Sequence, residues 1–270
     1  MDLSRITAER FGDEWHDFSV VGEYSKDQFL DWIHPLTQEF LRGKRVLDAG
    51  CGNGRLITWA QKFGASEVCG IDFGKAVEVA RRNTRAFGNV HIVQADIRHL
   101  PLLPEFDYIY CIGVLHHLPD PSEGFRALTK VLKPGGTLSV WVYGEEGNEL
   151  VRRFIDPIRT KFTSKLPSVV LHPISFIFTL FAYALLKVIY IPIAQDAMWL
   201  YKRLPMHEYI RTWFPYPFHE VYNLIHDQLI TPITHYISKA TLEQWVVEAG
   251  MNECTITQRG GNGWRLCAKK

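Results

Sequence analysis

Three glycines and an acidic residue lie close together near position 50 in a pattern that suits ligand binding. The segment reads Val46-Leu47-Asp48-Ala49-Gly50-Cys51-Gly52-Asn53-Gly54, with an apolar run before the glycines and a helix-period stripe after them. Glycine has no Cβ, so a strand-to-helix turn of this kind lets the backbone approach a ligand closely. Asp48 would repel a pyrophosphate but could favour a cationic ligand such as a sulfonium or an ammonium. The turn therefore predicts a site for a flat or extended ligand.

A nicotinamide site is the first alternative for these glycines. The dinucleotide fingerprint G-x-G-x-x-G needs a glycine at its sixth position, where this sequence has Arg55. A nicotinamide-dependent oxidoreductase is therefore disfavoured, although the glycines alone leave it open.

Two further acids repeat the position of Asp48 at the end of an apolar run. Asp72 and Asp96 follow at successive intervals of 24 residues, and one βα unit fits each interval. A carboxylate after the second strand can accept hydrogen bonds from two ribose hydroxyls, whereas it would repel a 2′-phosphate. An isolated Asp at such a place is also a common helix N-cap.

The elements that position these residues alternate between short apolar runs and helix-period stripes, which is typical of a parallel sheet wound with crossover helices. Strands are expected at Arg45–Ala49, Glu67–Asp72, Val90–Asp96, Phe106–Gly113 and Gly136–Tyr143. Gly64 and Gly88 are expected to end the first two helices as C-terminal caps. The predicted fold class is α/β, with a doubly wound, seven-stranded, mostly parallel sheet, a C-terminal antiparallel hairpin and a helical insertion.

The predicted strands and helices divide the chain into four segments. They are a helical lead-in at 1–43, a ligand-binding core at 44–144, a mostly helical insertion at 145–235 and a C-terminal completion of the sheet at 236–270. In the lead-in, Ser25 and Gln28 have the spacing of a capping box. In the last segment, a helix at Thr241–Ala249 is expected before the strands Cys254–Gln258 and Trp264–Ala268.

Composition narrows the classes of protein further. The chain has 270 residues, a formal net charge of +1 and five widely spaced cysteines without a C-x-x-C pair. This disfavours a disulfide framework and a zinc ribbon, and indicates reduced thiols in a cytoplasmic setting. The charged N-terminal stretch does not resemble a signal peptide. Near-zero net charge gives no general attraction to a phosphate backbone, so a nucleic-acid partner is disfavoured.

Four motifs in order resemble the class I S-adenosylmethionine (SAM) dependent methyltransferases. They are V-L-D-A-G-C-G-N-G at 46–54, I-D at 71–72, A-D-I at 95–97 and L-K-P-G-G at 132–136. The stretch G-V-L-H-H-L-P-D-P at 113–121 is similar to the branch that methylates small molecules. The resemblance covers about residues 44–144 and, more loosely, 237–270.

This resemblance implies SAM as the cofactor and a set of binding residues. Gly50, Gly52 and Gly54 would lie under the methionyl part, with Asp48 close to that loop. Asp72 would accept from both ribose hydroxyls. Asp96 would accept from the adenine amino group, while Phe73 and Ile97 pack on the base. The carbonyl of Ile112 would face the methionyl ammonium.

Methyl transfer from a sulfonium is an in-line displacement, so positioning and desolvation can carry most of the catalysis. If the acceptor is a hydroxyl, a histidine is the natural proton acceptor. His116 and His117 follow the fourth strand, at the edge where open α/β sheets hold ligands. Their alternative role is to cap a helix or to hold the loop together. His235 and Tyr236 are further candidates to line the acceptor pocket, and no spacing predicts a metal site.

The residues after the fourth strand also bear on the acceptor. Amino methyltransferases that act on nucleic acids usually carry an Asp/Asn-Pro-Pro-aromatic motif there, whereas this chain has Ile112-Gly113-Val114-Leu115. The absence of that motif therefore favours a small or lipid-like acceptor, methylated at oxygen, nitrogen or carbon. Cys111 is expected to be a core residue.

The insertion contains a long apolar run. No Asp, Glu, Lys or Arg occurs from Leu166 to Leu186, which is long enough to span a bilayer. A single crossing would place the last two strands on the far side of the membrane from the sheet that they complete, and Pro167 and Pro173 should break the start of the run. The segment is expected to be a lid over an apolar acceptor, a peripheral membrane contact or a homodimer surface through 166–200.

The sequence thus predicts a SAM-dependent methyltransferase. A nicotinamide-dependent oxidoreductase and a non-catalytic scaffold protein with a methyltransferase fold are the alternatives. Localisation is expected to be cytoplasmic, with peripheral contact at the membrane as an extension.

Overall fold

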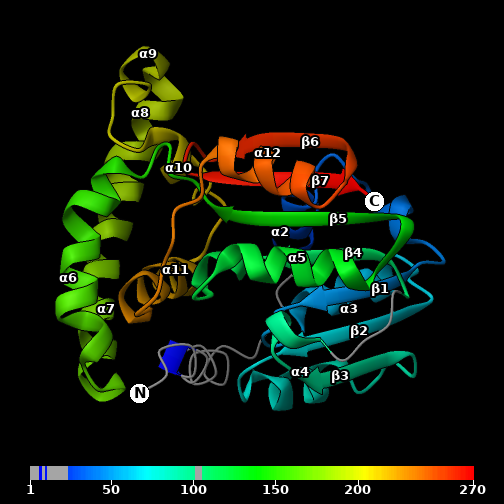
Figure 1. Ribbon diagram of the computed structural model, residues 1–270. Helices are drawn as coiled ribbons and strands as arrows, with labels where there is room; N and C mark the ends of the chain where they lie inside the picture. The colour runs from blue at the N-terminus through cyan, green and yellow to red at the C-terminus, as the bar shows by residue number, and fades with distance from the viewer. Residues whose placement is uncertain (1–5, 8–9, 11–23, 101–104) are drawn as a thin grey trace. The chain divides into compact units, whose positions relative to one another are not determined.

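The computed structural model describes residues 6–7, 10, 24–100 and 105–270 (Figure 1). The chain divides into two compact units. The sheet unit comprises Met1–Gly144, Ile233–Thr257 and Trp264–Lys270, and the helical unit comprises Glu145–Pro232 and Gln258–Gly263.

A seven-stranded sheet is the centre of the sheet unit. Its strands are β1 (Arg45–Ala49), β2 (Glu67–Asp72), β3 (Val90–Gln94), β4 (Phe106–Ile112), β5 (Leu132–Tyr143), β6 (Asn252–Arg259) and β7 (Gly263–Lys269). The spatial order is β3-β2-β1-β4-β5-β7-β6. β1 to β5 are paired in parallel, and the C-terminal strands form the antiparallel pair. The predicted fold class is confirmed.

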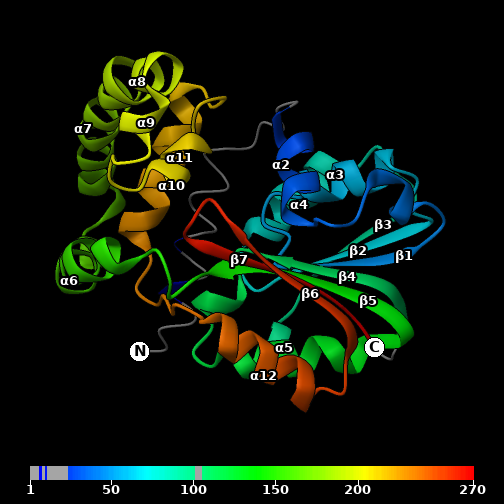
Figure 2. The same cartoon turned by 90° about the horizontal axis from the view of Figure 1, so that it is seen from above.

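Helices cover both faces of this sheet (Figure 2). α2 (Tyr24–Trp32), the 3-10 helix Gln38–Leu41, α3 (Arg55–Lys62) and α4 (Ala76–Thr84) lie on one face; α5 (Pro121–Val131) and α12 (Lys239–Glu248) lie on the other. Short 3-10 helices at Ile97–His99 and Leu115–His117 follow β3 and β4. Alternate strand residues supply the two cores: Leu47 and Ala49 pack with α5 and α12, whereas Val46 packs with α2 and α3.

Several local expectations differ from the structure. Ser25 is not an N-cap, because α2 already includes Tyr24; its Oγ accepts from Trp59 Nε1 at 2.6 Å. Gly64 adopts the expected left-handed conformation (φ 90°), but α4 ends at Thr84, four residues before Gly88. β5 begins at Leu132, before the Pro-Gly-Gly that was expected to delay it.

The helical unit is built around two helical segments. One is a continuous run of α7 (Ser168–Leu185), the π-helical turn Leu186–Tyr190 and α8 (Ile191–Asp196), and the other is α11 (Phe218–Ile230). Smaller elements are the π-helical turn Val151–Ile155, α6 (Asp156–Lys161), the 3-10 turn Thr163–Lys165, α9 (Met198–Tyr201) and α10 (His207–Arg211). α7 and α11 lie side by side in both views (Figures 1 and 2).

Pro173 does not break α7, contrary to expectation. It lies inside the helix, and Pro167 occupies the N-cap position before it. A proline in the first turns of a helix removes only one hydrogen bond, and the helix continues past it when its side chains pack.

Candidate functional site

The turn between β1 and α3 is held tightly against the end of β2. The amides of Gly50 and Cys51 both donate to the carbonyl of Ile71 at 2.8 Å. Gly50, Gly52 and Gly54 have φ of 89°, 51° and 79°, a region that side chains disfavour. A Cβ on Gly50 would lie 2.3 Å from Cγ2 of Val114. The glycines therefore form a backbone cradle that no larger residue could make.

Asp72 is tied to this cradle at the end of β2. Its carboxylate accepts from the amide of Gly52 at 3.0 Å through one oxygen and from the amide of Gly74 at 2.8 Å through the other. Burial raises the pKa of Asp72, and these amide hydrogen bonds oppose the shift. Each carboxylate oxygen has a second lone pair, so the group can still accept from ligand hydroxyls.

Asp48 is the most deeply buried acid of the site, with 2% of its surface exposed. It stands beside Tyr110 across the β1–β4 pairing. Burial raises the pKa of Asp48 to about 8; the Tyr110 hydroxyl lowers it and the charge of Asp72 raises it. In the described part of the chain, Oδ2 of Asp48 has no hydrogen-bond partner. A buried carboxyl of this kind gains from a nearby cation or donor.

Asp96 carries a partner that the motif did not indicate. Arg98 donates from Nη2 to Oδ2 at 2.7 Å and from Nε to Oδ1 at 3.1 Å, and the Arg98 amide also donates to Oδ1 at 2.9 Å. Burial would raise the pKa of Asp96, but the hydrogen bonds and charge of Arg98 hold it below its usual value. A ligand amino group at Asp96 would have to share this carboxylate with Arg98.

The predicted apolar contacts differ in exposure. Phe73 is 40% exposed at the start of the loop after β2, whereas Ile97 is 4% exposed and packs in the core. Ile112 is half-buried as the last residue of β4. The Phe73 ring is thus accessible to a planar ligand, whereas the Ile97 side chain lies mostly within the core.

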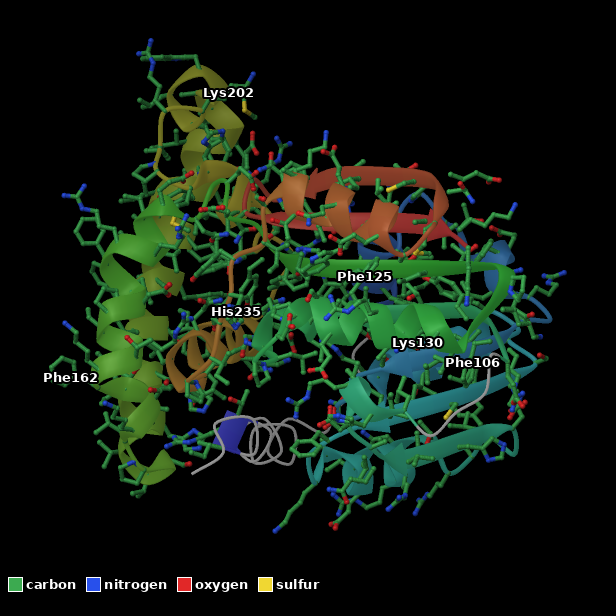
Figure 3. The ribbon with its side chains drawn as sticks, in the orientation of Figure 1. Phe106, Phe125, Lys130, Phe162, Lys202 and His235 are labelled. Atoms are coloured by element: carbon green, nitrogen blue, oxygen red, sulfur yellow. The ribbon has the colours of Figure 1, made fainter. Side chains whose placement is uncertain are left out.

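The three predicted histidines come together beyond the end of β4. His116 is fully buried, and its carbonyl accepts from the amide of His235 at 2.8 Å. His117 is 8% exposed, and its Nδ1 lies 2.8 Å from the carbonyl oxygen of Ile233. His235, labelled in Figure 3, is half-buried on the segment that leads to α12.

The hydrogen bond of His117 assigns its tautomer. A carbonyl oxygen only accepts, so Nδ1 must carry the proton, and in the neutral ring Nε2 then holds the lone pair. His116, by contrast, is packed between aromatic rings, with ring centroids 4.2 Å from His117 and 4.1 Å from Tyr143. Of the two, His117 has the better placement for taking a proton.

Sequence reasoning missed some of the residues that shape this region. Tyr110 faces Asp48, and only the pairing of β1 with β4 reveals it. Asn53 is 2% exposed, and its Oδ1 accepts from the Arg55 amide at 3.1 Å, across Gly54, the N-cap of α3. Asn side chains commonly accept from the amide two residues on, so this hydrogen bond was readable in the sequence. Tyr143 was also missed; it stacks on Tyr236, a residue that the sequence did single out, with 6.3 Å between ring centroids.

Cys111 is fully buried in the core, as expected. Over the residues that the structure describes, no group of three or more His, Cys, Asp or Glu side chains could hold a metal ion.

Known proteins share sequence with about half of this chain. The chain is 36% identical to a ubiquinone biosynthesis O-methyltransferase of Neisseria meningitidis over 139 residues, which cover 47% of the chain and 56% of that protein. An uncharacterized protein of Synechococcus is also 36% identical, over 47% of the chain and 34% of that protein. The matches therefore cover about a third to a half of these relatives' length.

Solved structures share the fold over nearly the whole chain. A magnesium protoporphyrin IX methyltransferase from Synechocystis, solved with bound SAM, superposes with a TM-score of 0.55 at 15% identity, covering 100% of this chain and 98% of that one. A SAM-dependent methyltransferase from Thermotoga maritima gives a TM-score of 0.56 at 14% identity and covers 99% of both chains.

A family match agrees with both comparisons. Residues 47–140, from β1 to β5, match the family described as a methyltransferase domain. Residues 47–140 therefore form a methyltransferase domain by this match, and the chain shares its fold with solved SAM-dependent methyltransferases.

Proposed function

We propose that this chain binds SAM in the β1–α3 cradle and transfers its methyl group to a small or lipid-like acceptor. One observation carries the proposal: the glycine turn at 50–54 is tied to Asp72 through the Gly52 amide, beside the buried carboxyl of Asp48. This combination supplies, in one place, a close backbone approach, an acceptor for hydroxyls and a buried carboxyl whose charged form a neighbouring cation would stabilise.

The residues present fit this cofactor. The cradle that a Cβ on Gly50 would fill suits the methionyl part, and the orphaned Oδ2 of Asp48 suits the positive charge nearby. Asp72 would accept from the ribose hydroxyls. Phe73 and Ile97 would pack on the adenine, with Asp96 accepting from its amino group. Ile112 would offer its carbonyl to the ammonium.

When bound, SAM supplies an electrophilic methyl on a sulfonium. The chain itself has to hold the acceptor in line, exclude water and take up a proton. If the acceptor is a hydroxyl, Nε2 of His117 would take up the hydroxyl proton when the methyl is transferred to the oxygen. The carbonyl of Ile233 fixes this orientation through Nδ1. His235 would border the acceptor through its tie to His116.

The relatives favour oxygen as the methylated atom. Several are named ubiquinone biosynthesis O-methyltransferases, a name that specifies transfer to oxygen. An oxygen of a small or lipid-like molecule is therefore the acceptor that we propose for this chain.

Calorimetry tests the cofactor assignment. The variant Asp72→Asn should bind SAM about 10- to 100-fold more weakly, because hydrogen bonds to a charged group contribute roughly 1.5–3 kcal/mol. Glu78→Gln, which removes an exposed carboxylate of α4, is the matched control and should bind like the original protein. Thermal melting of each variant checks that it is folded. Unchanged affinity in a folded Asp72→Asn protein would remove the assignment.

Turnover separates the enzyme from its alternatives. An acceptor screen of metabolites and lipid extracts with radiolabelled SAM should yield a methylated product. With that acceptor, His117→Ala should lower kcat by about 10²- to 10⁴-fold and remove the acidic limb of the pH–rate profile. Wild-type kcat in this variant would reject His117 as the proton acceptor. SAM binding without any turnover would favour the scaffold alternative, and binding of NADH instead of SAM would favour the oxidoreductase.

A further inference from the structure

The continuous helix Ser168–Asp196 exposes its apolar side chains to solvent. Over its most apolar 18 residues the mean hydropathy is 2.1, yet only 17% of those residues are buried. Five large apolar side chains of this helix, here called the outer face, are 57–77% exposed: Val169, Ile177, Leu180, Phe181 and Val188. A water-soluble helix normally turns such a face toward its own core.

The buried residues of the same helix include two polar ones as well as Leu171 and Leu186. Ser175 and Thr179 are fully buried, and Ser175 Oγ lies 2.8 Å from Nδ1 of His226 on α11. Nδ1 of His172 likewise lies 2.7 Å from the hydroxyl oxygen of Tyr222 on α11. The helix therefore buries hydrogen-bonded polar groups beside Leu171 and Leu186, while many of its large apolar side chains remain outside. This is the arrangement expected of a surface that meets lipid.

A transmembrane crossing does not fit the helical unit. The helix is long enough at about 44 Å, but the chain must return to complete the sheet. The packed partner α11 has only 13 residues, and Glu220, His226 and Asp227 lie within it. A second crossing needs about 20 apolar residues. The outer face can therefore meet a bilayer only by lying in its surface.

Basic residues outnumber acidic ones in the part of the chain that contains this helix. From 150 to 207 the chain holds eight Lys and Arg against two Asp and no Glu. Seven of the eight are exposed: Arg152, Arg153, Lys161, Lys165, Lys187, Lys202 and Arg203. Two apolar residues next to the first of these charges in the sequence are also exposed: Phe154 is 57% exposed and Phe162, labelled in Figure 3, is 65% exposed.

Amphipathic side chains accompany these charges. Arg203 lies over the ring of Trp199, 5.2 Å from its centroid, and Trp199 is 65% exposed. Lys187 lies 5.1 Å from the ring centroid of Tyr183. Trp and long basic side chains suit the boundary between acyl chains and headgroups, because each has an apolar body and a polar end.

We propose that the helical unit docks on an anionic lipid bilayer, with the outer face of Ser168–Asp196 inserted among the acyl chains and the exposed Lys and Arg of residues 150–207 on the headgroups. Apolar burial and headgroup attraction act together in such a contact. The proposal rests on the helical unit alone and does not depend on methyl transfer.

Vesicle sedimentation of the full chain tests this docking. At low salt the protein should pellet with phosphatidylglycerol vesicles and much less with phosphatidylcholine vesicles. Ile177→Glu combined with Phe181→Glu should lower the partition coefficient more than about tenfold, since each side chain loses its transfer into lipid. Lys161→Glu with Lys165→Glu should weaken binding to the anionic vesicles only.

Val247→Glu is the matched control, because Val247 is 78% exposed on α12 in the sheet unit. It should sediment like the original protein. Failure to pellet with phosphatidylglycerol vesicles, or equal pelleting of the Ile177/Phe181 variant, would overturn the proposal. If light scattering shows a dimer that the same two substitutions dissociate, and the protein does not bind vesicles, the proposal would be overturned in favour of self-association.

Discussion

Asp48 shows how position alone changes the chemistry of a residue. In the sequence it is one of three acids that end apolar runs, yet only this one is almost completely enclosed, next to Tyr110 on the neighbouring strand. Asp72 is held by two backbone amides and Asp96 by Arg98. Three acids with the same sequence setting therefore have three different environments.

The enclosure of Asp48 predicts a pH-dependent stability. Its pKa is about 8 in the folded protein against 3.8 ordinarily, so between these values the folded state keeps a proton that the unfolded state loses. Stability contributed by the neutral carboxyl is thus lost as the pH rises from about 4 to 8, at up to about 1.4 kcal/mol per pH unit. Asp48→Asn removes this loss.

Urea unfolding without ligand measures the effect. The free energy of unfolding of Asp48→Asn, relative to the original protein, should increase by about 2–3 kcal/mol from pH 5 to pH 7. A relative stability that stays constant over this range would contradict the burial of a neutral carboxyl at Asp48.

At this scale the sequence reveals some roles and conceals others. The glycines and Asp72 could be placed because a strand-to-helix turn constrains them locally. Tyr110 could not, since its proximity to Asp48 depends on which strands pair and in which register. The Arg98 pairing of Asp96 lies within three residues and could have been anticipated.

At the scale of elements, buried strands were the easiest to predict. β1 and β2 have the predicted bounds, because their apolar runs end at an Asp and a turn. Helix ends were harder: α4 stops before Gly88, and α7 runs through Pro173. Tertiary packing of the helix decides these ends as much as local propensity does.

The absence of a side chain at Gly70 allows α3 to pack closely on the sheet. A Cβ on this β2 residue would lie 2.4 Å from Cδ1 of Ile57 on α3 and 2.9 Å from Cδ1 of Ile92 on β3. Gly70→Ala should therefore destabilise the protein by about 1–3 kcal/mol in urea unfolding, as overpacked cores do. Gly88→Ala is the control, because nothing lies within 4 Å of its Cβ. Equal stability of the two variants would show that α3 can retreat without cost.

At the scale of the whole molecule, the helical unit leaves more of its large apolar residues exposed than the sheet unit does. The sheet unit buries Leu47, Ile71 and Phe125 in continuous cores, whereas the helical unit leaves Ile177 and Phe181 exposed. The length of the apolar run was evident in the sequence, but the direction in which its face points was not, because apolar or small residues occur around most of the helix. The sequence therefore favoured a lid over an apolar acceptor, with a membrane contact and a dimer surface as the alternatives.

We propose that the cradle at 50–54, together with Asp48, Asp72 and Asp96, holds the adenosyl and methionyl groups of SAM. A crystal structure of the protein with sinefungin, a stable SAM analogue, would test this binding mode. Electron density is expected along the ends of β1, β2 and β3, with the ribose hydroxyls at the Asp72 carboxylate. A saturated crystal in which the analogue binds elsewhere, or leaves Asp72 without a ligand contact, would contradict it.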